Sequence, residues 1–442
     1  MARERRERPQ AQAPASRNQS RDRVIWAILA GFLAAYVFLF ILPIFLDESQ
    51  RMMFFRYIPT LPQRGIIGED AKSIQLFVLG WFNGQDPYSV EGISNGVFYP
   101  PLALLLLSPL GLVSAQAAYV LMLGLTLACY VGLSLWLPVA FSKRLTPVLL
   151  LFFLTGLFSY SLQFELERGQ YNVTSVFLSL LAVFLFHAYP KIRWLRWVAY
   201  GLLTTAIQLK LYPAIFVFLL VTDWTQWREN LKRLIAIGAV NFLLLLALGW
   251  NLFLSFVRSI SSFSADIHGE KINHSAASFG AYALGVLDTD RLLNTSPASA
   301  AFAAQISSVA TLICAAVFAA ILVACILIGA KRPARGPAPP VLLACTLGAL
   351  LIPSTSFDYT IAFLPASLAI YFQHLADTWS HRSSPGVSTI RHWLRHGVVA
   401  VMSLAYFSTL FSYTNKPDLF FLVNNFPALI LLLLLTPLLA IL

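Results

Sequence analysis

The sequence predicts an all-α, polytopic membrane protein. The chain has 442 residues, of which 58% are hydrophobic and only 12% are charged, and its mean hydropathy is +0.71. A soluble domain is about half apolar and about a quarter charged, so this composition lies outside the soluble range. Long apolar segments alternate with short basic ones along the chain, as in membrane-spanning helices. We expect about 12 or 13 spans, because about 20 apolar residues cross a bilayer.

The N-terminal segment is polar and rich in arginine. Residues 1–23 hold almost no large apolar side chain, which predicts a disordered basic tail on the cytoplasmic side. Residues 24–46 carry no charge and lack an obvious small-residue cleavage site. We therefore expect a retained first span rather than a removed signal peptide, and a single transmembrane domain over residues 24–442.

Residues 47–97 form the longest polar stretch after the tail, and the positive-inside rule predicts that they are the first extracytoplasmic loop. Within this loop, Ile74, Phe77, Val78 and Trp81 recur at helical spacing. They predict a short amphipathic helix over residues 71–82 that lies along the membrane surface. The segment "NGQDPYS" then ends this helix with turn residues.

The other apolar segments are candidate spans, namely 99–114, 115–137, 145–162, 171–189, 197–222, 234–257, 301–329, 339–352, 358–376, 396–413 and 424–442. Basic clusters place 223–233, 330–338 and 377–395 inside, which leaves 258–300 as a second large outer loop. The basic cluster at 191–196 leaves two topologies open. Residues 197–222 are either one span or a hairpin of two short helices around Lys210.

Composition and motifs exclude several functional classes. The net charge is +11, but the chain has no nucleic-acid-binding module and no basic-aromatic platform, so we expect no nucleic-acid partner. It has no P-loop, HExxH or strand-linked GxGxxG motif. The four cysteines lie in apolar runs without metal-binding spacing, and Asp288-Thr289-Asp290 fits a loop or helix cap. We expect no metal and no cofactor.

Three outer segments bring ionisable side chains to one membrane face. They contain Glu69, Asp70 and Lys72 in the first loop, residues 258–274 in the second loop, and residues 354–358. Lys210 lies in an apolar segment, where an isolated ammonium is costly, so it is either functional or paired. This set fits transfer of a group from a lipid-phosphate carrier. A carboxylate would accept the proton of an acceptor hydroxyl, and cations would hold the phosphate.

Five segments, in this order, resemble glycosyltransferase family 87 over residues 60–375. "LGWFNGQDPYSVEGISNGVFYPPLALLLLSPL" is similar to the family's short helix, G-x-x-P-Y, Y-P-P and proline-broken helix. "ERGQYNVTSVF" resembles its G-Q-x-N motif, and "QLKLYPAIF" resembles its K-x-x-P helix. "KINHSAAS" looks like its N-x-S motif, and "IPSTSFDYT" looks like its S-P-x-S segment.

The resemblance implies a GT-C membrane fold and a polyprenyl-phosphate sugar donor, often polyprenyl-phosphate mannose. It also implies an outward-facing site in the inner membrane, an envelope glycolipid or glycan as acceptor, and Asp70 as general base. We expect donor-phosphate or acceptor contacts from Glu69, Lys72, Gln170, Asn172, Lys210, Arg258, Lys271, Asn273, His274, Asp358 and Tyr359. This sequence departs from the family at Phe357-Asp358, where a His often follows, and at His274, where Gln is common.

Two alternatives to this enzyme stay open at the level of sequence. A lipid-sugar flippase or transporter would place ionisable groups near the bilayer midplane between two repeated halves. An enzyme like the O-antigen ligases would place Arg and His residues of one large outer loop at its centre instead of Asp70.

Overall fold

The fold is described from a computed structural model. It describes residues 15–46, 67–93, 97–221, 223–265, 273–278, 297–331 and 338–381. Every regular element in these ranges is a helix, and the only β-bridge among them is an isolated one between Asn273 and Phe357. The predicted all-α class is therefore confirmed. The chain divides into two compact units, Met1–Tyr57 and Ile58–Leu442.

The first unit consists of one long helix and two short extensions, α1 (Ala15–Tyr36), η1 (Val37–Ile41) and η2 (Leu42–Phe45). The candidate span within it, Arg23–Phe45, matches the first span expected at 24–46. Helix α1 begins inside the segment 1–23 that was expected to be a tail. Residues 1–14 of that segment lie outside the described residues.

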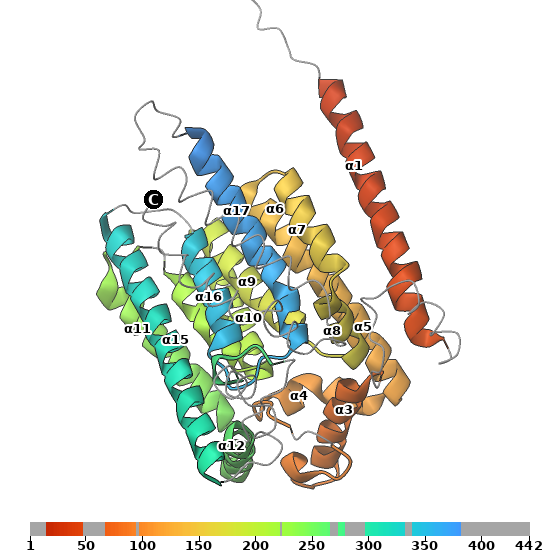
Figure 1. The fold of residues 1–442 in the computed structure, drawn as a ribbon, viewed down its shortest axis with the longest axis vertical. Helices are drawn as coiled ribbons and strands as arrows, with labels where there is room; N and C mark the ends of the chain where they lie inside the picture. Colours follow the sequence, from red (N-terminus) through yellow and green to blue (C-terminus); the bar gives the residue numbers. More distant parts are fainter. Residues whose placement is uncertain are drawn as a thin grey trace, which may run out of the picture. The chain divides into compact units, whose positions relative to one another are not determined.

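The second unit is a helix bundle (Figure 1). Its elements in chain order are α3 (Glu69–Phe82), η3 (Pro87–Ser89), α4 (Ala103–Leu107), η4 (Ser108–Leu112), α5 (Ala115–Val131), η5 (Gly132–Trp136), α6 (Leu137–Ser142), α7 (Pro147–Leu157), α8 (Tyr160–Arg168), α9 (Asn172–Ala188), α10 (Arg193–Leu209), η6 (Tyr212–Leu220), α11 (Trp227–Leu245), α12 (Trp250–Ala265), α15 (Pro297–Lys331), α16 (Pro339–Leu351), η7 (Asp358–Phe363) and α17 (Leu364–His381).

Several helices are long and apolar enough to cross a membrane. Within the described ranges there are three such helices, Arg23–Phe45, Ala115–Ser142 and Gln305–Ala324, or up to five if two bent pairs are each one span. The polytopic membrane class is therefore confirmed. The expected total of about 12 or 13 spans stays a prediction. The candidate spans 396–413 and 424–442 lie outside the described residues.

The segment 197–222 forms a hairpin against α9. Helix α10 runs back along α9, and the Tyr171 hydroxyl at the start of α9 donates to the carbonyl oxygen of Leu209 at 3.3 Å. After the turn, η6 follows the direction of α9 again, and Nε2 of His187 lies 2.7 Å from the carbonyl oxygen of Leu219. Of the two predicted topologies, the hairpin of two short helices is therefore confirmed.

The hairpin brings two basic clusters to the same end of the bundle. The guanidinium groups of Arg196 and Arg233 both stand over the ring of Phe186, at 5.9 and 5.2 Å. The clusters at 191–196 and 223–233 therefore share one end, which we call the basic end. The turn of the hairpin lies at the other end.

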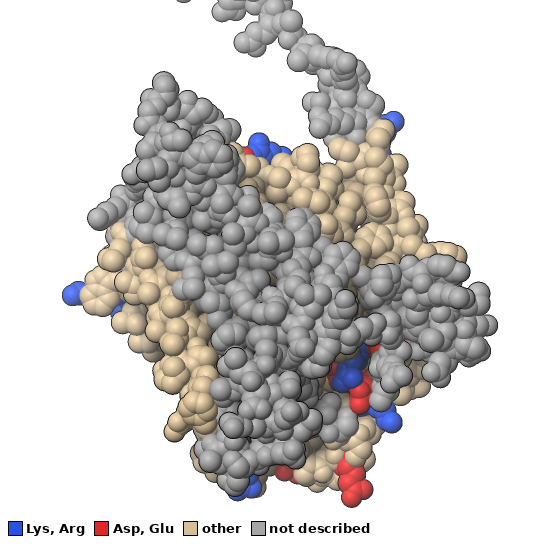
Figure 2. All heavy atoms as spheres, viewed as in Figure 1, with Lys and Arg blue, Asp and Glu red and all other residues tan. Residues whose placement is uncertain are grey.

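On the face shown in Figure 2, acidic and basic atoms lie together at the lower right, where Figure 1 places α3.

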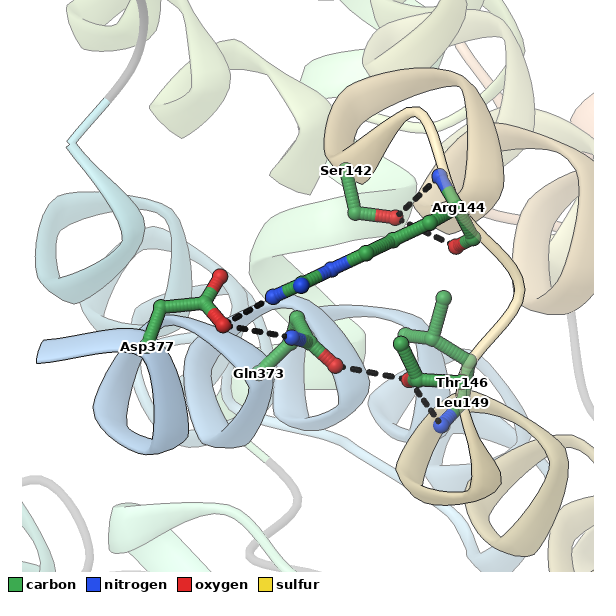
Figure 3. A network of polar contacts seen from close by, with 6 residues as sticks. All are labelled: Ser142, Arg144, Thr146, Leu149, Gln373 and Asp377. Carbon is green, nitrogen blue, oxygen red and sulfur yellow. Dashed lines mark hydrogen bonds and ion pairs between the residues drawn. The ribbon is translucent and has the colours of Figure 1, made fainter. Parts of the chain in front are cut away.

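A polar network at the basic end joins the turn between α6 and α7 to α17 (Figure 3). Arg144 pairs with Asp377, whose Oδ1 also accepts a hydrogen bond from Gln373 Nε2 at 2.9 Å. The Thr146 hydroxyl donates to Gln373 Oε1 at 2.6 Å. The side chains of Arg144 and Asp377 remain 53% and 45% exposed, so solvent screens this pair.

Helix α3 is the predicted amphipathic helix of the first loop, and its apolar face packs on the protein. Ile74, Phe77 and Val78 are fully buried against the residues of α4, η4 and α5. Gln75 on the same face donates from Nε2 to the carbonyl oxygen of Leu110 at 3.0 Å. The proline-broken segment 99–114 therefore covers this face, and the expectation that the helix lies along the membrane surface stays a prediction.

The span expected at 234–257 is divided between two helices, α11 and α12. The chain bends by 102° between them. Gly249 adopts a φ of +108° at the bend, a conformation that favours glycine. Residues 258–265, which were expected to start the second outer loop, belong to α12, and residues 297–300 already belong to α15.

Helix α12 packs on the first loop. The Ser259 hydroxyl donates to the carbonyl oxygen of Val97 at 2.7 Å, and the Ser255 hydroxyl donates to Asp86 Oδ2 at 2.7 Å. The other carboxylate oxygen of Asp86 accepts the N–H of Tyr88 at 3.0 Å, which starts η3. Asp86 is thus a turn residue, as predicted, and it also anchors α12.

Candidate active site

Helix α8 and the turn after it carry the polar centre of the candidate site. Ser159 starts α8 by accepting the N–H of Leu162 at 3.3 Å. Gly169 ends the helix with a left-handed φ of +70°, so the chain turns at once into α9. A side chain at Gly169 would meet Cβ of Ala71 at 2.7 Å. The end of α8 therefore lies directly against the start of α3.

Arg168, the last residue of α8, binds both acids at the start of α3. Its Nε donates to Asp70 Oδ2 at 3.0 Å, its Nη2 donates to Asp70 Oδ1 at 2.6 Å, and its Nη1 pairs with Glu69. Gln170 Nε2 also donates to Asp70 Oδ2, at 2.8 Å. A carboxylate offers about four acceptor positions. Among the described residues, Asp70 therefore keeps one position, on Oδ1, for a further donor.

Gln170 joins Asp70 to Lys210 through its amide group. Lys210 Nζ donates to Gln170 Oε1 at 3.2 Å. The ammonium also stands over the rings of Tyr99 and Tyr171, 4.6 and 4.9 Å from their centroids. Lys210 thus contacts an amide and two aromatic rings, and no carboxylate bonds to it directly among the described residues.

Residues of the first-loop motifs contact Tyr99, one of the two aromatic rings next to the Lys210 ammonium. The Tyr88 hydroxyl donates to the carbonyl oxygen of Tyr99 at 2.7 Å, and the ring of Phe77 meets both tyrosine rings edge-on. Burial, and then the nearby charge of Asp86, raises the pKa of Tyr88, so its hydroxyl stays protonated and donating. The loop therefore holds the ring of Tyr99 beneath Lys210.

A second polar group joins two chain segments that are far apart in the sequence. Asn273 Oδ1 accepts the N–H groups of Ser275 at 3.1 Å and of Ser356 at 2.8 Å. The next residue, His274, pairs through Nε2 with Oδ1 of Asp358, and both side chains are almost fully buried. Asp358 Oδ2 has no hydrogen-bond partner within the described part of the chain.

Element η7 brings this second group beside α8. The ring of Tyr359 lies 5.6 Å from the ring of Phe164, between their centroids. Tyr359 also interacts electrostatically with Asp70 and Arg168. The two polar groups therefore lie at the same end of the bundle, opposite the basic end.

Most of the expected site residues lie in these two groups. The first contains Glu69, Asp70, Gln170 and Lys210, with Asn172 beside it, and the second contains Asn273, His274, Asp358 and Tyr359. Lys72 and Arg258 are exposed, and their side chains make no polar contact with the described residues. Lys271 lies outside the described residues. No three His, Cys, Asp or Glu side chains in the described ranges gather as metal ligands.

Sequence reasoning missed Arg168. It lies in the segment "FELERGQ", from which only the G-Q-x-N resemblance was used. Charged residues between two apolar segments are costly and need partners, and this was the signal available in the sequence. Charge counting could not assign residues 163–196 to one side of the membrane, so no sequence argument connected this segment to Asp70.

The described part of the chain is an all-helical bundle that includes apolar helices of bilayer length. Acids, an amide and cations cluster at one end of this bundle. These features define a polytopic membrane protein with a polar site at one end of its helices. The chain belongs to glycosyltransferase family 87, whose sequence model matches residues 98–356, more than half of its length. It is therefore a membrane glycosyltransferase, which favours the enzyme over a transporter. The match includes Arg168, Gln170 and Lys210 and begins after Asp70. No curated protein and no solved structure matches the chain.

Proposed function

We propose that the protein transfers a sugar from a polyprenyl-phosphate carrier to a hydroxyl of an envelope glycolipid or glycan, with inversion at the anomeric carbon. The sugar is mannose or another hexose or pentose. The observation that carries this proposal is Asp70, which Arg168 and Gln170 orient, which keeps one open acceptor position among the described residues, and which Gln170 joins to Lys210. The activated sugar–phosphate bond supplies the driving force, so the reaction needs no cofactor.

Asp70 can act as a general base because hydrogen bonds orient its carboxylate but leave one acceptor position open. The acceptor hydroxyl would donate to the open position on Oδ1. As this proton moves to Asp70, the hydroxyl oxygen attacks the anomeric carbon, and the carbon–oxygen bond to the phosphate breaks. Polyprenyl phosphate leaves with the bonding electrons. A positioned base of this kind contributes about 10² to 10⁴ to the rate.

Lys210 would hold the carrier phosphate. An ammonium has three N–H groups, and the one that donates to Gln170 leaves two for phosphate oxygens. Cations that meet the phosphate stabilise the charge that builds on it as the sugar leaves. A basic group of residues 258–274, Arg258 or Lys271, would assist, while Asn273 and His274 would contact donor or acceptor.

The site would face the extracytoplasmic side of the inner membrane. Basic residues that flank spans stay mainly in the cytoplasm. The clusters at 191–196 and 223–233 share the basic end, and the site lies at the opposite end of the bundle. This arrangement supports an outward-facing site and an acceptor in the envelope.

The direct test is transfer by an Asp70→Asn variant in membranes that contain a labelled polyprenyl-phosphate sugar. The amide cannot accept the proton, so we expect transfer to fall by about 10² or more. Asp86→Asn is the matched control, because Asp86 is an acid of the same loop and an Asn can still start η3. Near-normal transfer by a folded Asp70→Asn protein would remove Asp70 as the base.

The donor class is tested with the parent protein. We expect transfer from a polyprenyl-phosphate sugar alone, without added nucleotide sugar. Transfer that requires a nucleotide sugar in purified, lipid-reconstituted protein would contradict the proposed donor. Mass spectrometry of envelope glycolipids and glycans, with and without the gene, then identifies the sugar and the acceptor.

A further inference from the structure

The ammonium of Lys210 contacts two tyrosine rings that come from different segments of the chain. Nζ lies 4.6 Å from the centroid of the Tyr99 ring and 4.9 Å from the centroid of the Tyr171 ring. The two rings also contact each other, with their centroids 5.4 Å apart and an angle of 43° between their planes. We call Tyr99 and Tyr171 the tyrosine pair.

Each ring of the tyrosine pair is held by contacts of its own. Tyr171 is buried, and its hydroxyl donates at 3.3 Å to the carbonyl oxygen of Leu209, the residue directly before the lysine. The backbone of Tyr99 is restricted because Pro100 follows it. The ring of Phe77 meets the Tyr99 ring edge-on, with 5.9 Å between the centroids. The tyrosine pair is therefore fixed by the fold itself.

Aromatic rings give the ammonium a kind of support that a carboxylate would not. An ammonium in an apolar segment is costly and usually pairs with an acid. Among the described residues, the hydrogen-bond partner of Lys210 is the neutral amide of Gln170. The face of an aromatic ring attracts a cation but carries no net charge. The tyrosine pair therefore stabilises the ammonium without neutralising it. Since Lys210 is only partly buried, its positive charge can meet an anion.

We infer that Tyr99 and Tyr171 are positioning residues for the donor: their rings hold the ammonium of Lys210, without a neutralising acid, for the phosphate of the lipid-linked sugar. The role toward the phosphate rests on the proposed function, whereas the contact between ammonium and rings does not. Tyr99 lies in the segment "YPP" and Tyr171 in "GQYN". These two segments and Lys210 would then form one site for the phosphate.

The test changes the charge distribution of the ring while its shape stays nearly constant. Phenylalanine and its mono-, di- and trifluorinated analogues are placed at position 99 of the full-length protein. Each fluorine withdraws electron density from the ring face and weakens its attraction for a cation. The KM for a polyprenyl-phosphate sugar, measured in reconstituted membranes, should rise with each fluorine. From Tyr99→Phe to the trifluorinated ring we expect a rise of about fivefold or more.

Phe153 is the matched control for the fluorinated rings. It is fully buried and stacks on the ring of Tyr130. Among the described residues, the cations that stand over aromatic rings lie over other rings. The same fluorinated analogues at position 153 should therefore leave the KM unchanged.

A melting cycle on the detergent-purified protein tests the contact without any substrate. Relative to Tyr99→Phe, the trifluorinated ring at position 99 should lower the melting temperature by about 1–2 °C, because the contact with the ammonium is weakened. Lys210→Met removes the cation and keeps an apolar side chain of similar length. In that variant the fluorines should cause no such decrease, so the two changes are coupled.

Each outcome decides one part of the inference. Additive melting temperatures in the cycle would overturn the contact between the ammonium and the ring. A coupled cycle together with a KM that stays constant across the fluorinated series would overturn the positioning role. If the parent protein transfers no sugar from the lipid-linked donor, the proposed function fails and the role toward the phosphate fails with it, while the melting cycle still decides the contact.

Discussion

Arg168 binds Asp70 through two hydrogen bonds, from Nε to Oδ2 at 3.0 Å and from Nη2 to Oδ1 at 2.6 Å, although the residues are 98 positions apart. The guanidinium and the carboxylate meet as two planar forks, a geometry that restricts the orientation of both groups. The contact joins α8 to α3. It therefore holds the proposed base, at the start of α3, against the end of α8.

Arg168→Lys should reduce sugar transfer by about 10² or more, because an ammonium cannot form both bonds to the carboxylate at once. The charge is retained, so any loss reports the orientation of Asp70 and not the net charge of the site. Initial rates in membranes measure it. Arg193→Lys, at an exposed position at the basic end, should leave the rate unchanged. Equal rates for Arg168→Lys and the parent protein would show that the fork is dispensable.

Gly169→Ala should destabilise the protein more than Gly84→Ala does. Both glycines have a left-handed φ, +70° and +72°, which costs a non-glycine residue about 1 kcal/mol or more. At Gly169 the added Cβ would also meet Cβ of Ala71 at 2.7 Å, whereas nothing lies within 4 Å at Gly84. Overpacking adds about 1–3 kcal/mol.

Thermal unfolding in detergent measures the two glycine variants. The displaced α3 should also lower sugar transfer by Gly169→Ala, because Asp70 lies on that helix. Equal melting temperatures for the two variants would mean that α3 moves freely and that the close contact between Gly169 and Ala71 is unimportant.

His274→Asn should destabilise the protein by about 3–5 kcal/mol, because it leaves Asp358 as a buried acid without its ion-pair partner. Chemical unfolding in detergent measures the loss. Adding Asp358→Asn to that variant removes the stranded carboxylate and should recover most of the stability. A double variant no more stable than His274→Asn would argue that packing of the histidine ring, and not the pairing, stabilises the segment.

Asp377→Asn should change the stability by less than about 1 kcal/mol, because its pairing with Arg144 is half exposed and screened by solvent. The position lies at the basic end, away from the site, so sugar transfer should match that of the parent protein. Both measurements are made beside His274→Asn, so that a half-exposed pair is compared with a buried one. A strong loss of transfer in Asp377→Asn would indicate that the network in Figure 3 affects the distant site.

Much of the architecture could be predicted from local properties of the sequence. Apolar length and spacing located α3 and the first span, and turn residues located the bend at Asp86. The same reasoning failed where contacts with another segment of the chain decide the structure. Helical spacing showed which face of α3 is apolar, but only tertiary packing showed that protein and not lipid covers Ile74 and Phe77.

The candidate site was predicted in part. Asp70, Gln170 and Lys210 were singled out from separate segments, and the structure shows that one amide joins the two charged groups. Arg168 was missed because charge counting could not place its segment on either side of the membrane.

The sequence by itself determined that this is an all-α membrane protein with acids in its first loop, because composition, apolar length and residue spacing are properties of the chain alone. Only the tertiary structure decided that 197–222 is a hairpin and that Asp70 is held by Arg168. These features depend on which helix ends meet in space. In a chain of short and bent helices, that depends on packing between segments far apart in the sequence.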